Sequence, residues 1–133
     1  MKVIVDTCIW SLALRRSKET FIPEKEELIQ LIDQGRVIVL GPVRQEILSG
    51  IKEPKQFEKL STHLASFPDH QINSSDYETA ASYFNKCKAK GMQGSNTDFL
   101  ICAVASNNDF SIFTTDQDFT RFKKYLPIKL HKY

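Results

Sequence analysis

Short apolar runs separated by helix-like segments constrain the fold of this chain most strongly. Residues 3–5, 37–40 and 111–113 show almost no polar alternation, which is typical of parallel strands buried on both faces. Strands are expected at residues 2–5, 36–40, 70–72, 111–113 and 128–130. Helices are expected at residues 7–16, 23–35, 43–48, 54–67, 97 onward and 119–125, with another running to residue 91 from a cap at Ser74 or Ser75. Strands alternating with helices predict an α/β fold of three α/β/α layers around a mostly parallel central sheet.

Composition fits one folded domain spanning residues 1–133. The chain has 41% hydrophobic and 26% charged residues, which is ordinary for a globular protein. A net charge of +2 neither requires nor excludes a nucleic-acid partner. No stretch is long and apolar enough to span a membrane and no signal peptide is visible, so we expect a cytoplasmic protein without a membrane partner.

Three cysteines are spaced too irregularly for a disulfide framework or a structural zinc site. Cys8 and Cys102 lie among apolar neighbours and are expected to be small buried hydrophobic residues.

Acidic residues stand at the ends of the apolar runs. Asp6 directly follows the first run, and Asp116 follows the run 111–113 after two threonines. Glu46 lies in the helix after the second run, and Asp98 immediately precedes the apolar block 99–105. In parallel sheets the binding crevice lies outside the carboxyl ends of the strands, so these acids are expected to meet at one edge. Carboxylates beside buried segments are unfavourable without a compensating cation.

This acidic set suits a hard divalent cation. Mg²⁺ and Mn²⁺ prefer carboxylate oxygen and water, and no histidine is placed to favour zinc. Such a site can bind a phosphodiester, activate water and stabilise a leaving oxygen.

Each acid also has an ordinary structural explanation. Asp6 could cap the first helix, Ser95 and Asp98 fit a capping box, and Asp116 or Asp118 could begin the helix at Phe119. Glu46 could be an exposed helical residue. Independent capping, however, does not predict that the acids meet at one edge.

Four short blocks resemble those of PIN-domain nucleases. They are Val5-Asp6-Thr7-Cys8, Arg44-Gln45-Glu46-Ile47, Thr97-Asp98-Phe99-Leu100-Ile101 with the alanines that follow, and Phe113-Thr114-Thr115-Asp116 with Asp118-Phe119. The resemblance spans essentially the whole chain. Its size and layout are similar to the VapC toxins of prokaryotic toxin–antitoxin pairs.

The resemblance implies an endoribonuclease that depends on Mg²⁺ or Mn²⁺, with RNA as substrate. Its acidic site would comprise Asp6, Glu46, Asp98 and Asp116, with Asp118 at a position where the family varies. Thr7 and Thr114 would orient carboxylates or water by hydrogen bonds, although turn and cap chemistry is the alternative for both. A cognate antitoxin and a homodimer are the implied protein partners.

Basic and apolar residues around this site suggest binding surfaces. Two basic clusters could hold RNA phosphates or could simply be solvated. The first cluster is Arg15, Arg16 and Lys18, and the second is Lys52 and Lys55. Lys86, Lys88 and Lys90 recur too closely to define one helical face. An apolar face formed by the first helix and residues 54–67 could receive an antitoxin. The residues of this face are Trp10, Leu14, Phe57, Leu60 and Leu64. Packing in the core is the alternative explanation for them.

Three rival functions remain. A housekeeping PIN nuclease would cleave RNA without an antitoxin. A phosphoacceptor signalling domain would want paired acids after the first strand, whereas Thr7 follows Asp6 here. A catalytically silent binding domain would not need the full set of acids.

Overall fold

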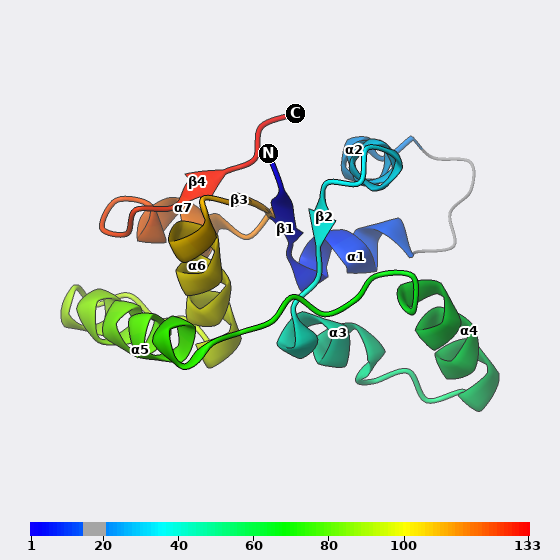
Figure 1. Cartoon of the computed structure of the whole chain (residues 1–133), viewed down its shortest axis with the longest axis horizontal. Helices are drawn as coiled ribbons and strands as arrows, with labels where there is room; N and C mark the ends of the chain where they lie inside the picture. The colour runs from blue at the N-terminus through cyan, green and yellow to red at the C-terminus, as the bar shows by residue number, and fades with distance from the viewer. Residues whose placement is uncertain (15–20) are drawn as a thin grey trace.

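One parallel sheet organises the computed structural model, which describes residues 1–14 and 21–133 (Figure 1). Within these residues the four strands are β1 (Val3–Val5), β2 (Val37–Ile38), β3 (Ser111–Phe113) and β4 (Lys129–Leu130). Their order is β2-β1-β3-β4, and every pairing is parallel. The register sets Val3 opposite Val37 on one side and opposite Ser111 on the other. All three residues of β1 are fully buried, as the apolar run predicted.

Seven helices within the described residues cover this sheet. They are α1 (Thr7–Ala13), α2 (Pro23–Asp33), α3 (Gly41–Leu48), α4 (Pro54–Leu64), α5 (Ser74–Ala89), α6 (Asn96–Asn108) and α7 (Gln117–Phe122). In Figure 1 helices α1 to α4 lie to one side of the strands, and α5 to α7 lie to the other. The predicted α/β/α fold with a parallel sheet is therefore confirmed. None of the helices in these ranges is long and apolar enough to cross a membrane.

Helix α6 is the most completely buried helix, as its apolar sequence predicted. Every residue from 99 to 105 is buried. Helix α5 crosses α6 (Figure 1), and two hydrogen bonds join it to the end of α6. Asp76 near the start of α5 accepts from Asn107 at the end of α6 (2.9 Å), and Tyr83 bonds Ser106 (2.8 Å). In the second half of α5, the Phe84 ring packs on Phe99 near the start of α6, so this part of α5 lies beside the start of α6.

Several predicted boundaries were wrong for local reasons. Helix α3 begins at Gly41 rather than Val43, because Pro42 fits the first turn of a helix and does not form a separate turn. Residues 70–72 form no strand, since only Asp69 bridges to Val39 before the chain enters α5. Asn73, not a serine, caps α5 through a capping box with Asp76. The remaining shifts are at element ends: α1 ends at residue 13, α4 at 64, and α7 spans 117–122.

Candidate functional site

Asp6 is the deepest acid at the carboxyl edge of the sheet. It follows β1, and its side chain is buried at 7% exposure. Its backbone N–H bonds the carbonyl of Phe113, which fixes it beside the end of β3 (3.0 Å). One carboxylate oxygen, Oδ1, accepts from the backbone N–H of Thr7 and so caps α1 (2.8 Å). The other, Oδ2, accepts from the hydroxyl of Thr114 (2.8 Å). Asp6 is thus held by groups from two elements.

Two threonine hydroxyls extend this contact to further acids. The Thr7 hydroxyl donates to Oε1 of Glu46 on α3 (2.9 Å), although Glu46 is otherwise exposed. The Thr114 hydroxyl accepts from the backbone N–H of Asp116 (3.0 Å). Thr7 and Thr114 therefore contact Glu46, Asp6 and the backbone of Asp116. A continuous chain of neighbouring contacts joins Glu46, Asp6 and Asp116.

Asp98 reaches the same region from α6. Its Oδ2 accepts from the backbone N–H of Ser95 (3.1 Å), and its own N–H donates to the Ser95 hydroxyl (3.1 Å), which completes the capping box expected from the sequence. Burial raises the pKa of the Asp98 carboxyl, the bonds to Ser95 oppose that shift, and the charges of Asp6 and Asp116 raise the pKa further. The carboxylates of Asp6 and Asp116 therefore act electrostatically on Asp98.

Three of these acids have the capping roles that the sequence offered as the structural explanation. Asp6 and Asp116 are the N-caps of α1 and α7, and Asp98 occupies the third position of α6. Because each helix starts at the carboxyl edge, its cap residue is directed to that edge. Capping is therefore compatible with a shared site at that edge.

Asp118 and the basic candidates are placed less centrally. Oδ1 of Asp118 pairs with Arg121 one turn along α7 (3.1 Å). Lys52 and Lys55 are exposed on the α3–α4 connection and the first turn of α4. Arg15, Arg16 and Lys18 lie outside the described residues.

The donor set fits a hard cation in its chemistry. Its atoms are carboxylate oxygens with hydroxyls between them, the ligands that Mg²⁺ and Mn²⁺ prefer. As placed, however, no three acidic, histidine or cysteine side chains of the described residues lie close enough together to hold one ion. Histidines are engaged elsewhere: His131 bonds Glu27 (3.1 Å), and His70 packs on Phe110.

Cys8 is a site neighbour that the sequence did not reveal. Instead of being a buried hydrophobe, it is partly exposed, and its thiol lies 3.5 Å from both Oδ2 of Asp6 and the Thr114 hydroxyl. Its place in the first turn of the helix that Asp6 caps was the available signal. Cys102 is fully buried as predicted, and burial raises the pKa of its thiol.

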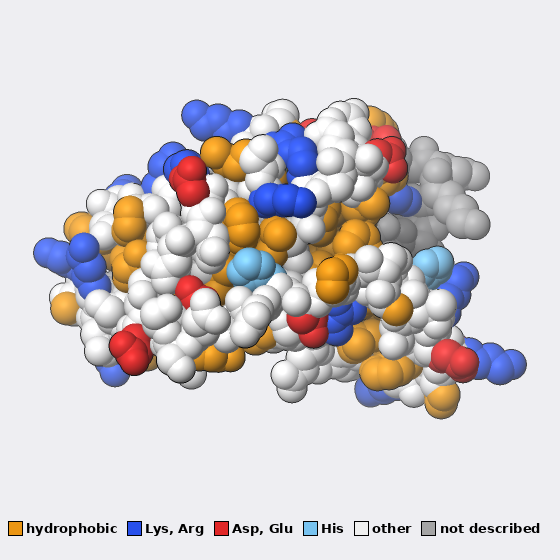
Figure 2. All heavy atoms as spheres, in the orientation of Figure 1, with side chains coloured by type: hydrophobic (Ala, Val, Ile, Leu, Met, Phe, Trp, Pro, Cys, Tyr) orange, Lys and Arg blue, Asp and Glu red, His pale blue; other side chains and the backbone are white. Residues whose placement is uncertain are grey.

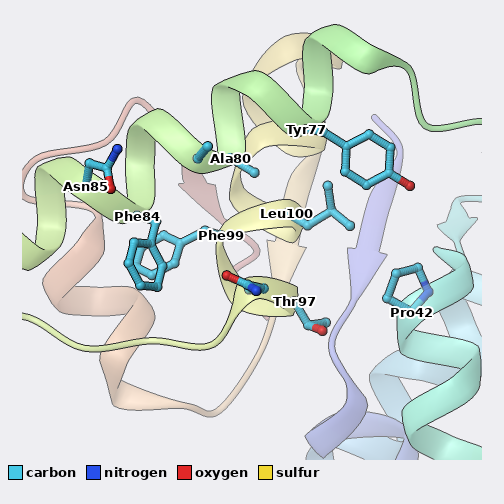
Figure 3. A pocket seen from close by; sticks show the side chains of 10 residues that line it. Pro42, Tyr77, Ala80, Phe84, Asn85, Thr97, Phe99 and Leu100 are labelled. Carbon is cyan, nitrogen blue, oxygen red and sulfur yellow. The ribbon is translucent and has the colours of Figure 1, made fainter.

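An apolar hollow of about 420 Å³ lies beside the start of α6 (Figure 3). Pro42 of α3, Tyr77 of α5 and Thr97 of α6 line it from three sides. None of the predicted carboxylates lines it, although Thr97 directly precedes Asp98. This hollow therefore borders the acidic edge but is not the acidic site.

The fold and the acidic edge together define a class of protein. The PIN domain family model matches residues 3–125, so the chain belongs to the PIN domain family. PIN domains are nucleases, and this membership supports a hydrolase that acts on nucleic acids. PIN nucleases generally use divalent metal ions. Membership in the PIN domain family also excludes the alternative of a phosphoacceptor signalling domain.

Several solved structures share this fold. VapBC2 from Rickettsia felis, bound to a DNA fragment from their promoter, gives a TM-score of 0.78 at 19% identity and covers 100% of this chain and 99% of that chain. FitAcB from Neisseria gonorrhoeae gives 0.73 at 16% identity, with 98% and 96% covered. VapBC-5 from Mycobacterium tuberculosis, a member of the VapBC family of toxin-antitoxin systems, gives 0.68 at 16% identity, with both chains covered completely. No curated protein matches the sequence significantly. The predicted likeness to VapC-type proteins is thus confirmed at the level of the fold.

Proposed function

We propose that this chain is a single-domain endoribonuclease dependent on Mg²⁺ or Mn²⁺, and the toxin of a toxin–antitoxin pair. The observation that carries the proposal is the contact chain from Glu46 through Thr7, Asp6 and Thr114 to Asp116, with Asp98 under the influence of the same charges. The PIN family match supports nucleic-acid hydrolysis at these residues. The cytoplasm is the location that goes with this function.

The acidic residues have distinct roles in this proposal. Asp6, Glu46, Asp98 and Asp116 would hold the cation, with Asp118 as an outer candidate because Arg121 engages it. A bound cation supplies charge neutralisation at the phosphodiester and a more acidic water. Thr7 and Thr114 fix the rotamers of the carboxylates through their hydroxyl bonds. Because the acids repel one another without a cation, their side chains are expected to draw together when it binds.

Metal dependence is the direct test of the proposed reaction. We expect purified protein to cleave single-stranded RNA with Mg²⁺ or Mn²⁺ and to lose that activity in excess EDTA, with recovery on adding the metal back. The products are read on a sequencing gel, with RNA profiling after brief induction in cells to find the cleaved sites. Cleavage that is undiminished by EDTA contradicts the proposed site.

An apolar groove supports the proposed antitoxin contact. A hollow of about 510 Å³ lies between α1, α3 and α4, and its apolar lining includes Leu14, Ile47, Ile51 and Leu60. Leu14 is 46% exposed, whereas Trp10 and Leu64 are buried in the core. Of the predicted apolar face, Leu14 and Leu60 thus line the groove, and Phe57 lies exposed nearby on α4. An amphipathic antitoxin helix could place its apolar side chains there.

Co-expression with the product of a neighbouring gene tests this partnership. We expect a stable complex with suppressed nuclease activity, because a basic partner side chain can compete with the cation at the acidic edge. Leu14→Glu should prevent copurification, since it puts a charge in the apolar groove. Ile29→Glu, at an equally exposed position on α2, should leave the complex intact. A fully active nuclease without a copurifying partner would instead identify the housekeeping alternative.

A homodimer completes the proposal. Tyr77 is 55% exposed next to the apolar hollow between α3, α5 and α6, which offers apolar surface for a second copy (Figure 3). The mass of the purified complex gives the number of copies.

A further inference from the structure

Cationic side chains are concentrated on the end of α5, the loop that follows it, and α7. Residues 84–95 and 117–125 contain six lysines and arginines but only one carboxylate, that of Asp118, whereas the whole chain has 18 basic and 16 acidic residues. The remaining residues are therefore net acidic. We call the six cations the basic ridge, and they are Lys86, Lys88, Lys90, Arg121, Lys123 and Lys124. Figure 2 shows lysine and arginine side chains projecting from the end of the molecule where α5 lies.

The packing of α5 on α6 directs the ridge lysines of α5 toward the start of α6, the helix that carries Asp98. Phe84, one turn before Lys88, packs edge-on against Phe99, which directly follows Asp98 (ring centroids 5.6 Å apart). The loop after Lys90 then leads to Ser95, the residue that caps α6 and bonds Asp98. A strand that left the acidic edge past Ser95 would therefore run toward the ridge.

Two hollows lie along the loop between the ridge residues Lys88 and Arg121. One of about 450 Å³ includes Lys88 in its lining, and one of about 530 Å³ includes Asp118 and Arg121. Both are lined by residues 91–93. They form a path along the loop that begins at Asp118 and ends at Lys88.

Gly94 holds this loop close to the core. A side chain at Gly94 would lie 2.8 Å from Cζ of Phe122 and 2.9 Å from Cε2 of Phe99, and both rings are buried and cannot move aside. The absence of a side chain therefore lets the backbone lie directly on the two rings.

The ridge lysines are available to an outside anion. The Lys88 ammonium lies over the Phe84 ring (5.9 Å), and that of Lys90 lies over the Tyr125 ring (5.4 Å). Neither these nor the other three ridge lysines form a salt bridge with any acid in the described parts of the chain. Aromatic contact orients their aliphatic stems while the charged ends remain hydrated.

We propose that the basic ridge binds the phosphate backbone of the RNA strand that passes through the acidic site. The inference rests on the proposed endoribonuclease function and adds the direction in which the strand runs, along the loop 91–94 toward the end of α5. Lys88 and Arg121, which line the two hollows, make the phosphate contacts nearest to the site. Backbone contacts of this kind carry affinity without reading sequence.

RNA binding in the absence of cleavage tests the ridge. Full-length Asp98→Asn protein without metal is titrated into fluorescently labelled single-stranded RNA across a salt series. Adding Lys88→Gln and Arg121→Gln should weaken binding at low salt about tenfold and lower the salt slope by roughly 1.4, since each contact with a single strand contributes about 0.7. Lys2→Gln is the matched control, because Lys2 precedes β1 at the opposite edge of the sheet and bonds Gly35.

Each outcome has a definite meaning. If the double variant and the Lys2→Gln control bind RNA with the same affinity and the same salt slope, the basic ridge does not bind the RNA backbone. This result is also expected if the ridge binds an acidic protein segment instead. If the wild type still cleaves RNA with Mg²⁺ in that case, the proposed function survives and only the ridge fails. If the wild type does not cleave RNA, the proposed function fails. Far-ultraviolet circular dichroism of each variant shows that the fold is retained, and Lys86→Gln with Lys90→Gln gives a second, independent pair.

Discussion

Asp98→Asn and Asp6→Asn should each abolish RNA cleavage while the domain still folds. The loss should exceed the roughly 100-fold that follows removal of a group that only orients a metal ligand. An asparagine at position 98 still offers an oxygen to the backbone N–H of Ser95, so the capping box survives. At position 6, asparagine can still accept from the N–H of Thr7.

Stability of the metal-free Asp98→Asn protein should equal or exceed that of the wild type at neutral pH. The pKa of Asp98 is raised above its usual 3.8, chiefly by burial and also by the charges of Asp6 and Asp116. Because the pKa of Asp98 is higher in the folded protein than in the unfolded chain, the protonated carboxyl favours folding. This contribution to stability is fully present below pH 3.8 and is lost as the pH rises through the folded-state pKa. The variant should therefore gain its advantage above that range and lose it in acid.

Urea unfolding in EDTA at several pH values, together with RNA cleavage in Mg²⁺, measures both effects. Asp33→Asn, at an exposed position at the end of α2, is the control for removing one negative charge. Full cleavage activity in either active-site variant would exclude the proposed mechanism.

Arg44→Met should produce the largest loss of stability, of about 2 kcal/mol, because hydrogen bonds to a charged group are worth about that much and two partly buried carbonyl partners would be left unpaired. Arg44 on α3 donates to Oδ1 of Asp69 (2.8 Å), to the carbonyl of Leu64 (2.8 Å) and to the carbonyl of Phe67. It thus ties α3 to the end of α4.

Activity should fall with stability in Arg44→Met because α3 also carries Glu46. Arg44→Lys should recover only part of the loss, since a single ammonium cannot replace the planar guanidinium at three acceptors. Gln45→Ala changes the exposed neighbour and should alter little. Denaturant midpoints and cleavage rates check both statements, and a wild-type midpoint in Arg44→Met would show that the three bonds contribute nothing to stability.

The strands and the acids could be predicted because their signals are local. A continuously apolar run specifies a buried parallel strand, and an acid at its end is directed to the carboxyl edge wherever the helices pack. The sequence therefore predicted β1, β3 and the capping box at Asp98. Whether the four carboxylates share one cation stays a prediction.

Features that depend on packing between distant segments could not be predicted. Lys86, Lys88 and Lys90 were spaced too closely to share a helical face, but α5 ends at Ala89 and leaves Lys90 in the loop. Only the contact of Phe84 on α5 with Phe99 on α6 shows that these lysines lie toward the start of the helix that carries Asp98. Similarly, the proximity of Cys8 to Thr114 depends on the pairing of β1 with β3.

At the starts of α1, α6 and α7, the hydrogen bonding of the acidic side chain and its negative charge are separate properties. A cap needs only an oxygen that accepts a hydrogen bond, and asparagine or serine supplies it as well as aspartate does. Asparagine at positions 6, 98 and 116 would thus start the same three helices without mutual repulsion. The negative charge is a separate property, and at Asp98 it opposes folding. A neutral triple variant would accordingly be a well-folded decoy, able to present every surface of this protein to an RNA or an antitoxin while lacking the charges that draw a cation.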